Sequence, residues 1–425
     1  MKKIIFLFLT VCFTISAFAQ TEPANYGSVV TKFKLYYNNN QPDSIYKLFG
    51  PEMKNALNPA QCKDMVSQLK STLGVLQQTT FTTYDEKTPV AIYAAVFQNS
   101  PITMTIQLNK EDKISGLYFR PVKQEAAPSD PSLTESPIKL KTLAGTIRGT
   151  LTMPKNASGK IPVVIIIPGS GYVDRNGNEP GLKTNTYKLL AEGLGKSGIA
   201  SLRYDKRMVG ESETGNKESD LRFEDYVDDA VGLVGMLNDD QRFSKVIILG
   251  HSEGSLVGML ASRDQPVKAF ISVSGAGDPA DKILTEQMKS KPQYIADGFK
   301  IVLDSLKKGK IDENIDPALY PIARPSIQRY LMSWCRYNPA KELKGVKVPI
   351  LLIQGTTDLQ VPVAEAEKLK KAKSDAILTI IPGMNHVLKE APADPEKNHA
   401  TYNNPDLPLK AELVPDIVAF INKLN

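Results

Sequence analysis

Cysteine and histidine are scarce in this 425-residue sequence, which contains three residues of each. Cys12 lies in an apolar stretch at the N-terminus, whereas Cys62 and Cys335 lie far apart in the rest of the chain. So few cysteines exclude a disulfide framework; we expect Cys62 and Cys335 to be free and buried, with a single long-range bridge as the alternative. Two cysteines and three dispersed histidines also make no convincing zinc cluster, so the sequence predicts no metal site.

The sequence also lacks a concentration of charge of one sign. It has 52 Lys and Arg residues against 46 Asp and Glu residues, which gives a net charge of +6. The basic residues are scattered, and no basic block is interleaved with aromatic side chains. Nucleic acid is therefore not an expected partner, because its phosphates are bound through clustered Lys and Arg.

Long apolar runs are missing except at the N-terminus. Lys2 and Lys3 precede an apolar stretch over residues 4–18 that ends in Ala17-Phe18-Ala19. A basic start, a short apolar core and this small-residue site predict a signal peptide over residues 1–19, so we expect a protein exported to the periplasm or secreted. A retained anchor is the alternative, although the stretch is short for a membrane span and no later segment is long enough for one.

The rest of the sequence separates into three regions. Residues 24–122 have helix-like stretches (26–37 and 61–73) followed by four short strand-like runs, which predicts a small α+β domain with an antiparallel sheet. Residues 123–137 contain Pro128, Pro131 and Pro137 among small and polar residues, which is typical of a linker. Residues 138–425 form the third region.

The third region alternates apolar runs with helical patterns after an opening hairpin. Near-continuous Ile, Val and Leu runs are typical of strands that are covered on both faces. The runs are 161–167, 199–204, 246–249, 269–273, 350–353 and 377–381, and helices are expected over 223–237, 255–262 and 363–372. This alternation predicts an α/β fold with a doubly wound, mostly parallel sheet.

One connection in this region is much longer than an ordinary crossover. It joins the runs that end at Val273 and begin at Ile350, and it contains helical stretches and the only tryptophan, Trp334. We expect residues 276–345 to form a helical cap over a site, because the insertion follows the strand directly after the motif described next. The alternative is that it only thickens the fold.

The strongest local motif is Gly250-His251-Ser252-Glu253-Gly254, which lies between an apolar run and a helical pattern. A serine on a tight strand-to-helix turn projects its hydroxyl above the sheet, and Gly250 and Gly254 leave room for that turn. The helix that follows presents its N–H groups to developing negative charge. The motif predicts Ser252 as a nucleophile and the N–H of Glu253 as an oxyanion donor, with His251 as a packing or orienting residue.

A serine nucleophile needs a base and a carboxylate that orients the base. After Ser252 only His386 and His399 remain, and His386 follows the last apolar run in a glycine-bearing loop, so we favour His386. Asp358 lies in the turn after the preceding run and is the expected acid, with an Asx-turn or helix-cap role as its alternative.

The loop after the first apolar run of the third region is expected to complete the oxyanion hole. It contains Gly169, Ser170 and Gly171, and its glycines allow the backbone to turn N–H groups inward. We assign Ser170 or Gly171 as the second donor without choosing between them. A plain glycine loop is the alternative.

Taken in order, these motifs resemble the α/β-hydrolase superfamily, and more narrowly bacterial carboxylesterases with an extra N-terminal domain of uncharacterised role. The resemblance also includes Asp174-Arg175-Asn176-Gly177 and the segment Arg203-Tyr204-Asp205-Lys206-Arg207. It implies hydrolysis of small, short-acyl carboxylic esters through an acyl-enzyme, without a metal or organic cofactor.

Two other functions remain open at the level of sequence. An exported aminopeptidase of the same fold would need acidic residues for the substrate amino group, and Glu286 or other cap acids are candidates. A non-catalytic binding protein on the same scaffold is the alternative of a different class. For the N-terminal domain we expect a partner in the cap, the substrate or another subunit.

Overall fold

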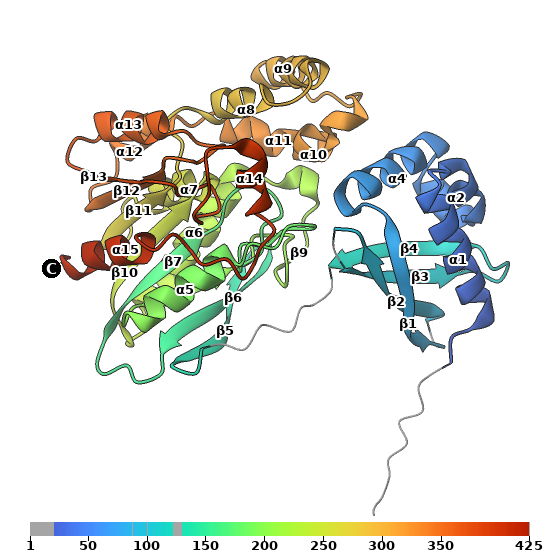
Figure 1. Ribbon diagram of the computed structural model, residues 1–425, viewed down its shortest axis with the longest axis horizontal. Coiled ribbons are helices and arrows are strands. Elements are labelled where there is room, and N and C mark those ends of the chain that lie inside the picture. Colours follow the sequence, from blue (N-terminus) through green and yellow to red (C-terminus); the bar gives the residue numbers. More distant parts are fainter. Residues whose placement is uncertain (1–20, 87, 100, 122–129, 425) are drawn as a thin grey trace, which may run out of the picture. The chain divides into compact units, whose positions relative to one another are not determined.

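The computed structural model describes residues 21–86, 88–99, 101–121 and 130–424, so the predicted signal segment lies outside the described residues. The chain divides into two compact units, Met1–Gln124 and Glu125–Asn425 (Figure 1). Each unit has its own hydrophobic core. None of the helices in the described residues has the length and apolar content needed to cross a bilayer.

The smaller unit is an α+β domain in which helices precede strands, as the sequence predicts. Its helices are α1 (Ala24–Asn38), α2 (Pro42–Leu48), α3 (Pro51–Ala56) and α4 (Pro59–Leu73). Its strands β1 (Leu76–Asp85), β2 (Val90–Phe97), β3 (Pro101–Leu108) and β4 (Ile114–Pro121) form an antiparallel sheet in that order. Helix α4 begins at a capping box between Asn58 and Gln61. The core lies between the helices and the sheet.

The larger unit is built on one twisted sheet, and the predicted α/β-hydrolase fold is confirmed. The strands are β5 (Leu133–Thr142), β6 (Gly145–Pro154), β7 (Ile161–Ile167), β8 (Ala200–Tyr204), β9 (Glu213–Thr214), β10 (Phe243–His251), β11 (Ala269–Val273), β12 (Ile350–Gly355) and β13 (Ile377–Ile381). In the described residues the sheet order is β13-β12-β11-β10-β7-β8-β6-β5, with β9 beside β6. Neighbours from β13 to β8 are parallel, and the pairings of β6 are antiparallel.

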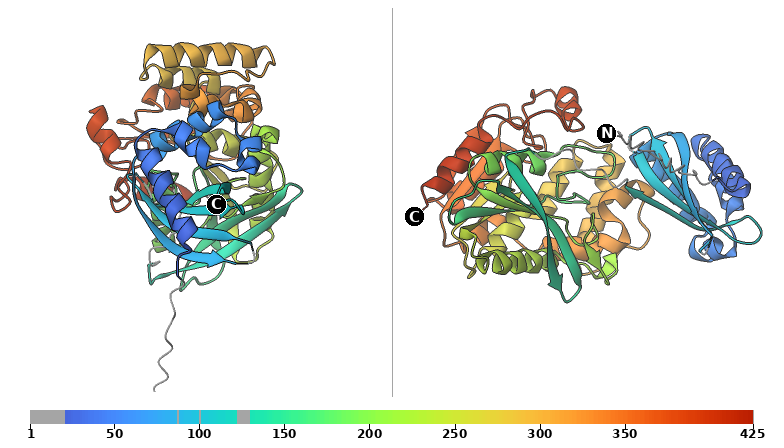
Figure 2. Two further views of the ribbon diagram at one scale, coloured as in Figure 1. Left: turned by 90° about the vertical axis from the view of Figure 1, so that its right-hand side faces the viewer. Right: turned by 90° about the horizontal axis from the view of Figure 1, so that it is seen from below.

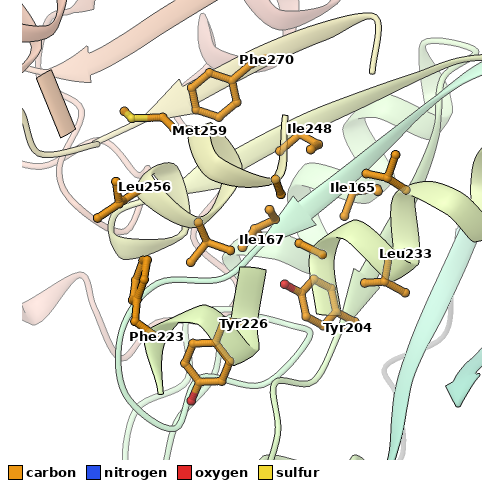
Figure 3. Packing of buried hydrophobic residues seen from close by; sticks show 14 of the residues in the cluster. Ile165, Ile167, Tyr204, Phe223, Tyr226, Leu233, Ile248, Leu256, Met259 and Phe270 are labelled. Carbon is orange, nitrogen blue, oxygen red and sulfur yellow. The ribbon is translucent and has the colours of Figure 1, made fainter. Parts of the chain in front are cut away.

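Helices cover both faces of this sheet, which explains the continuous apolar runs. Helices α6 (Phe223–Asn238) and α7 (Glu253–Ala261) pack on one face, where Leu233 and Met259 belong to the same buried cluster as strand residues such as Ile248 (Figure 3). Helices α5 (Thr186–Lys196) and α15 (Leu413–Asn422) contribute to the core on the other face. A helix α13 (Val363–Ala372) connects β12 to β13, and α14 (Pro395–Ala400) follows β13.

The long connection between β11 and β12 is helical. It contains α8 (Ala280–Met288), α9 (Gln293–Lys307), α10 (Tyr320–Ala323), α11 (Pro325–Trp334) and α12 (Pro339–Leu343). Helices α8 to α11 gather on one side of the larger unit in the different views of Figures 1 and 2. Phe223 of α6 stacks on Trp334 of α11 with nearly parallel rings, which ties the insertion to the hydrolase core.

The predicted linker over residues 123–137 is wrong at its C-terminal end, because the residues from Leu133 onward form β5. Each of them pairs with β6, from Leu133 opposite Pro154 to Pro137 opposite Thr150. Strand β5 is at the edge of the sheet, where a proline is tolerated because one side of the strand needs no ladder hydrogen bond. Pro137 therefore marks an edge strand here and not a linker.

Candidate active site

Ser252 occupies a strained turn between β10 and α7. Its backbone has φ 54° and ψ −121°, a conformation that costs on the order of 1–3 kcal/mol for a residue with a side chain. A Cβ on Gly250 would lie 2.1 Å from the carbonyl oxygen of Gly254, and a Cβ on Gly254 would lie 2.4 Å from that of Ile167. The two glycines of the motif are thus required by close backbone approaches that hold the serine in this turn.

His386 and Asp358 are in direct contact. The Nδ1 atom of His386 lies 2.9 Å from Oδ2 of Asp358, and both residues are buried. Burial would raise the pKa of the Asp358 carboxyl, but His386 and the backbone N–H groups of Gln360 and Val361 lower it overall. An ionised carboxylate accepts the proton on Nδ1, which leaves Nε2 of His386 as the atom that can accept a proton.

His251 has no nitrogen left for such a role. Its Nδ1 lies 2.8 Å from the hydroxyl of Tyr187, and its Nε2 lies 2.8 Å from the backbone carbonyl oxygen of His386. The carbonyl can only accept, so Nε2 carries the proton and Nδ1 accepts from Tyr187. Burial, followed by the proximity of His386, lowers the pKa of His251 to about 3. His251 is therefore a neutral link between the elbow and the His386 loop.

The glycine loop after β7 lies directly against the elbow. A Cβ on Gly169 would be 3.4 Å from Cβ of Ser252, so the loop backbone passes close to the serine. The loop is anchored by Arg175, whose backbone N–H and Nε donate to the two oxygens of Asp205 at 2.8 and 3.0 Å. This pair connects two of the segments on which the sequence resemblance rests. It fixes the loop to the end of β8.

A cavity of about 350 Å³ lies over the elbow. Ser170, Ser252 and His386 line it together with apolar and aromatic side chains. The insertion contributes a wall through Leu284, Pro321, Ile322, Ile327, Tyr330, Leu331 and Trp334. A smaller cavity of about 40 Å³ shares Ser170, Ser252 and Glu253 with the first, and residues of α8 also line it. The serine therefore lies where the two cavities meet.

A polar cluster in the lining of the larger cavity joins the glycine loop to the insertion. Arg324 donates to Glu218 through Nε at 2.9 Å and to the Tyr172 hydroxyl through Nη2 at 3.0 Å, and its guanidinium lies over the Tyr172 ring. The Tyr172 hydroxyl in turn donates to Glu218. These contacts hold the wall of the cavity against the loop that carries Ser170.

Sequence comparisons find similar proteins among hydrolases. A family model described as serine aminopeptidase, S33, matches residues 181–319. Esterase EstD from Thermotoga maritima is 26% identical to this chain over 298 residues, which are 69% of this chain and 70% of the relative. The chain is similar to α/β hydrolases in sequence as well as in the fold of its larger unit. A model described as a protein of unknown function (DUF3887) matches residues 30–117, so this α/β hydrolase carries the extra N-terminal domain that the resemblance implies.

A second sequence relative is a lipase. A monoacylglycerol lipase from Mycolicibacterium smegmatis is 25% identical over 246 residues, which are 54% of this chain and 84% of the relative. Among solved structures, Est1E from Butyrivibrio proteoclasticus with bound ferulic acid is 20% identical with a TM-score of 0.46, covering 68% of this chain and 98% of that chain. The sequence relatives support a hydrolase activity for this chain.

The remaining candidates from the sequence lie away from the cavities. His399 is exposed in α14, with its ring against Tyr402. Glu286 is exposed, pairs with Lys289 at 2.6 Å and lines neither cavity.

Cys62 and Cys335 are both free, but only Cys62 is fully buried, which corrects the prediction for Cys335. Within the described ranges no group of three or more His, Cys, Asp and Glu residues could hold a metal ion.

Sequence reasoning missed two residues that support the site. Tyr187 of α5 bonds to both Gly169 and His251, and Lys206 after β8 donates to the carbonyl of Gly169. Lys206 lies within a segment that the family resemblance includes, and this was the only feature of the sequence that could have indicated its role. For Tyr187 the sequence around the start of α5 has no motif that predicts such a contact.

Proposed function

We propose that this hydrolase is a serine esterase in which Ser252 is the nucleophile, His386 the base and Asp358 the acid that orients the base. The observation that carries the proposal is a strained serine at the head of a helix, beside a cavity lined by a histidine whose Nδ1 is bound to a buried carboxylate. The order of the three residues along the chain is that of the superfamily.

In the proposed mechanism, Oγ of Ser252 attacks the ester carbonyl while Nε2 of His386 takes its proton. The N–H groups of Glu253 and of the Ser170–Gly171 loop stabilise the oxyanion. His386 then protonates the leaving alcohol as the C–O bond breaks, which leaves an acyl group on Ser252. Water that is activated by His386 attacks this acyl-enzyme, and the acid and free serine are released.

The two cavities support a preference for short acyl groups. The leaving alcohol must lie beside His386, which protonates it, and His386 lines only the larger cavity. The acyl group is then directed into the smaller cavity of about 40 Å³, which has room for a few carbon atoms. We therefore propose small substrates with a short acyl chain and a larger, partly apolar alcohol.

An aminopeptidase is the second candidate, because the description of the matching family model names that activity. The acids that line the larger cavity are Glu179, Glu218 and Glu253, and none of these belongs to the insertion. Glu218 is already bound by Arg324. A panel of p-nitrophenyl esters and aminoacyl p-nitroanilides separates the two activities: we expect turnover of the esters, and turnover of the anilides alone would favour the peptidase.

The nucleophile is tested with Ser252→Ala. We expect this variant to lose turnover of p-nitrophenyl acetate and labelling by a fluorophosphonate probe. His386→Ala should lose turnover, whereas the matched variant His399→Ala should keep it. Labelling that persists in Ser252→Ala would remove Ser252 from its role. A wild-type protein inert to all esters, anilides and the probe would favour a non-catalytic binding protein.

We also propose that the protein is exported and that residues 1–19 are removed. The basic start and the Ala17-Phe18-Ala19 site support this proposal. Expression of the full chain in a bacterium, followed by intact-mass analysis of periplasmic and secreted fractions, should give a chain that begins near Gln20. A full-length chain retained in the cytoplasm would contradict it.

A further inference from the structure

The residue before Ser170 is held on both sides by buried side chains. The N–H of Gly169 donates to the hydroxyl of Tyr187 at 2.9 Å, and its carbonyl accepts from Nζ of Lys206 at 2.5 Å. Tyr187 and Lys206 are both buried. Hydrogen bonds thus fix both backbone polar groups of Gly169, and the next backbone donor along the loop is the N–H of Ser170.

The planarity of the peptide group connects Lys206 to that donor. No peptide bond in the described residues is cis, so the Gly169 carbonyl and the Ser170 N–H, which belong to the same peptide unit, point in opposite directions. An ammonium group that holds the carbonyl therefore also fixes the direction of the N–H. Ser170 lines both cavities together with Ser252 and Glu253, whereas Gly171 lines only the larger one.

We infer that Lys206 is a positioning residue for the oxyanion hole, which turns the N–H of Ser170 toward the acyl carbonyl and makes Ser170, and not Gly171, the second donor. The inference rests on the proposed esterase function and deepens it, because it specifies how the second donor is chosen and held.

The charge of Lys206 is balanced from the elbow itself. Its Nζ lies 3.7 Å from Oε1 of Glu253 and 5.0 Å from the centre of the Tyr226 ring. Burial lowers the pKa of the Lys206 ammonium, and the Glu253 carboxylate opposes that effect. Glu253 thus supplies one oxyanion donor through its backbone and anchors the other through its side chain. A cation on the carbonyl also polarises the peptide, which strengthens the N–H as a donor.

The decisive experiment compares Lys206→Met with the wild type on p-nitrophenyl acetate, with active sites counted by fluorophosphonate titration. Met keeps most of the length of the side chain, being one atom shorter, but removes its charge and its donor. Loss of one oxyanion donor costs about 100- to 1000-fold in kcat, so we expect its misalignment to lower kcat by about 10- to 100-fold, with KM changed by less than about twofold. A purely structural lysine would lower the number of titrated sites and leave kcat per site unchanged, which would overturn the inference.

Lys245→Met is the matched control. Lys245 also donates to a backbone carbonyl, that of Leu424, but it lies near the start of β10, at the opposite end of that strand from the elbow. We expect its kcat per site to equal that of the wild type. An equal loss of kcat in both variants would show a general effect of losing a lysine–carbonyl bond and would overturn the inference.

Two further variants keep the inference testable if Lys206→Met folds poorly. Lys206→Met with Glu253→Gln leaves no unpaired buried charge, and we expect it to fold better than the single variant and still to lose kcat. A wild-type kcat in this double variant would overturn the inference. In a Ser170→Pro background, which lacks the N–H, Lys206→Met should have little further effect on kcat; an undiminished effect would show that Lys206 acts through another group.

The outcomes for the two proposals are distinct. A wild-type protein without Ser252-dependent esterase activity would overturn the proposed function, and this inference with it. Normal wild-type activity together with a normal kcat in Lys206→Met would overturn this inference and leave the proposed function intact.

Discussion

At the scale of single residues, a buried chain of hydrogen bonds connects the three loops of the site. The N–H of Gly169 donates to Tyr187, the Tyr187 hydroxyl donates to His251, and His251 donates to the backbone carbonyl of His386. The loop that is proposed to complete the oxyanion hole, the elbow and the loop of the proposed base are thereby held in fixed positions relative to one another. Such buried networks are stabilising only when every member is satisfied.

Replacing Tyr187 with Phe tests the importance of this series of hydrogen bonds. The change leaves the Gly169 N–H and the Nδ1 atom of His251 without partners in a buried region, and each such group costs about 1–3 kcal/mol. We expect a lower free energy of unfolding in urea and a kcat for p-nitrophenyl acetate reduced by about tenfold, because a small misplacement of catalytic groups is costly.

Tyr204→Phe is the control for this prediction. Its hydroxyl is buried and has no hydrogen-bond partner among the described residues, so its removal should leave both stability and kcat nearly unchanged. Equal effects of the two Tyr→Phe changes on stability and kcat would contradict the importance of the hydrogen bonds made by Tyr187.

The buried state of His251 also predicts how stability depends on pH. Its pKa is about 3 in the folded protein, whereas the ordinary pKa of a histidine is 6.5, so between these values the unfolded chain binds a proton that the folded protein excludes. Stability therefore falls on acidification below pH 6.5, by up to about 1.4 kcal/mol per pH unit from this group.

Urea unfolding of the wild type and of His251→Gln between pH 4.5 and 7.5 checks this prediction. The variant should show a shallower decline below pH 6.5, whereas His399→Gln, which removes an exposed histidine, should keep the wild-type slope. A slope that His251→Gln leaves unchanged would assign the acid sensitivity to other groups.

The sequence predicted those parts of the candidate site that the backbone determines. Ser252, Asp358 and His386 each follow a strand, so their order and their place at the same edge of the sheet can be inferred from the pattern of runs. Their assignment as catalytic residues stays a prediction. Tyr187 and Lys206 could not be predicted as supports, because their contacts with Gly169 depend on how α5 and the loop after β8 pack in three dimensions.

At the scale of elements, the insertion between β11 and β12 sets the size of the smaller cavity. Ile283 of α8 lines this cavity, which is proposed to take the acyl group. Ile283→Ala should enlarge it and raise the kcat/KM ratio of p-nitrophenyl octanoate to p-nitrophenyl acetate by about tenfold, since even one additional methylene group is worth about 1–3 kcal/mol in an apolar pocket.

Ile301→Ala is the matched control in the same insertion. Ile301 is exposed on α9 and lines neither cavity, so its chain-length profile should equal that of the wild type. If Ile283→Ala also keeps the wild-type profile, the acyl group does not occupy the smaller cavity.

The elements that the sequence predicted well are those buried on both faces. Strands β7, β8, β10, β11 and β12 are nearly continuous apolar runs, and these patterns are hard to confuse with a surface loop. The start of β5 was missed because prolines and polar residues are tolerated at a sheet edge. Helices α5 and α15 were not predicted either, although both bury apolar residues against the sheet.

At the scale of the whole molecule, the two units have separate hydrophobic cores. The core of the smaller unit is built from α1, α2, α4 and its own sheet. The cores of the larger unit contain residues from β6 onward, and Ile138 and Leu140 of β5 pack against one of them. All residues of the candidate active site lie in the larger unit. Neither core borrows a strand from the other unit, so each has the requirements for folding independently.

A chain that consists of residues 130–425 should therefore fold and remain active. We expect its kcat and KM for p-nitrophenyl acetate to lie within about twofold of those of the chain without residues 1–19, because a small ester needs only the cavity over the elbow. In calorimetry the chain without residues 1–19 should show two thermal transitions. The shorter chain should retain one of them and lack the other. Folding without activity would instead assign the smaller unit a part in binding even the smallest substrate, and a failure to fold would show that the two cores depend on each other.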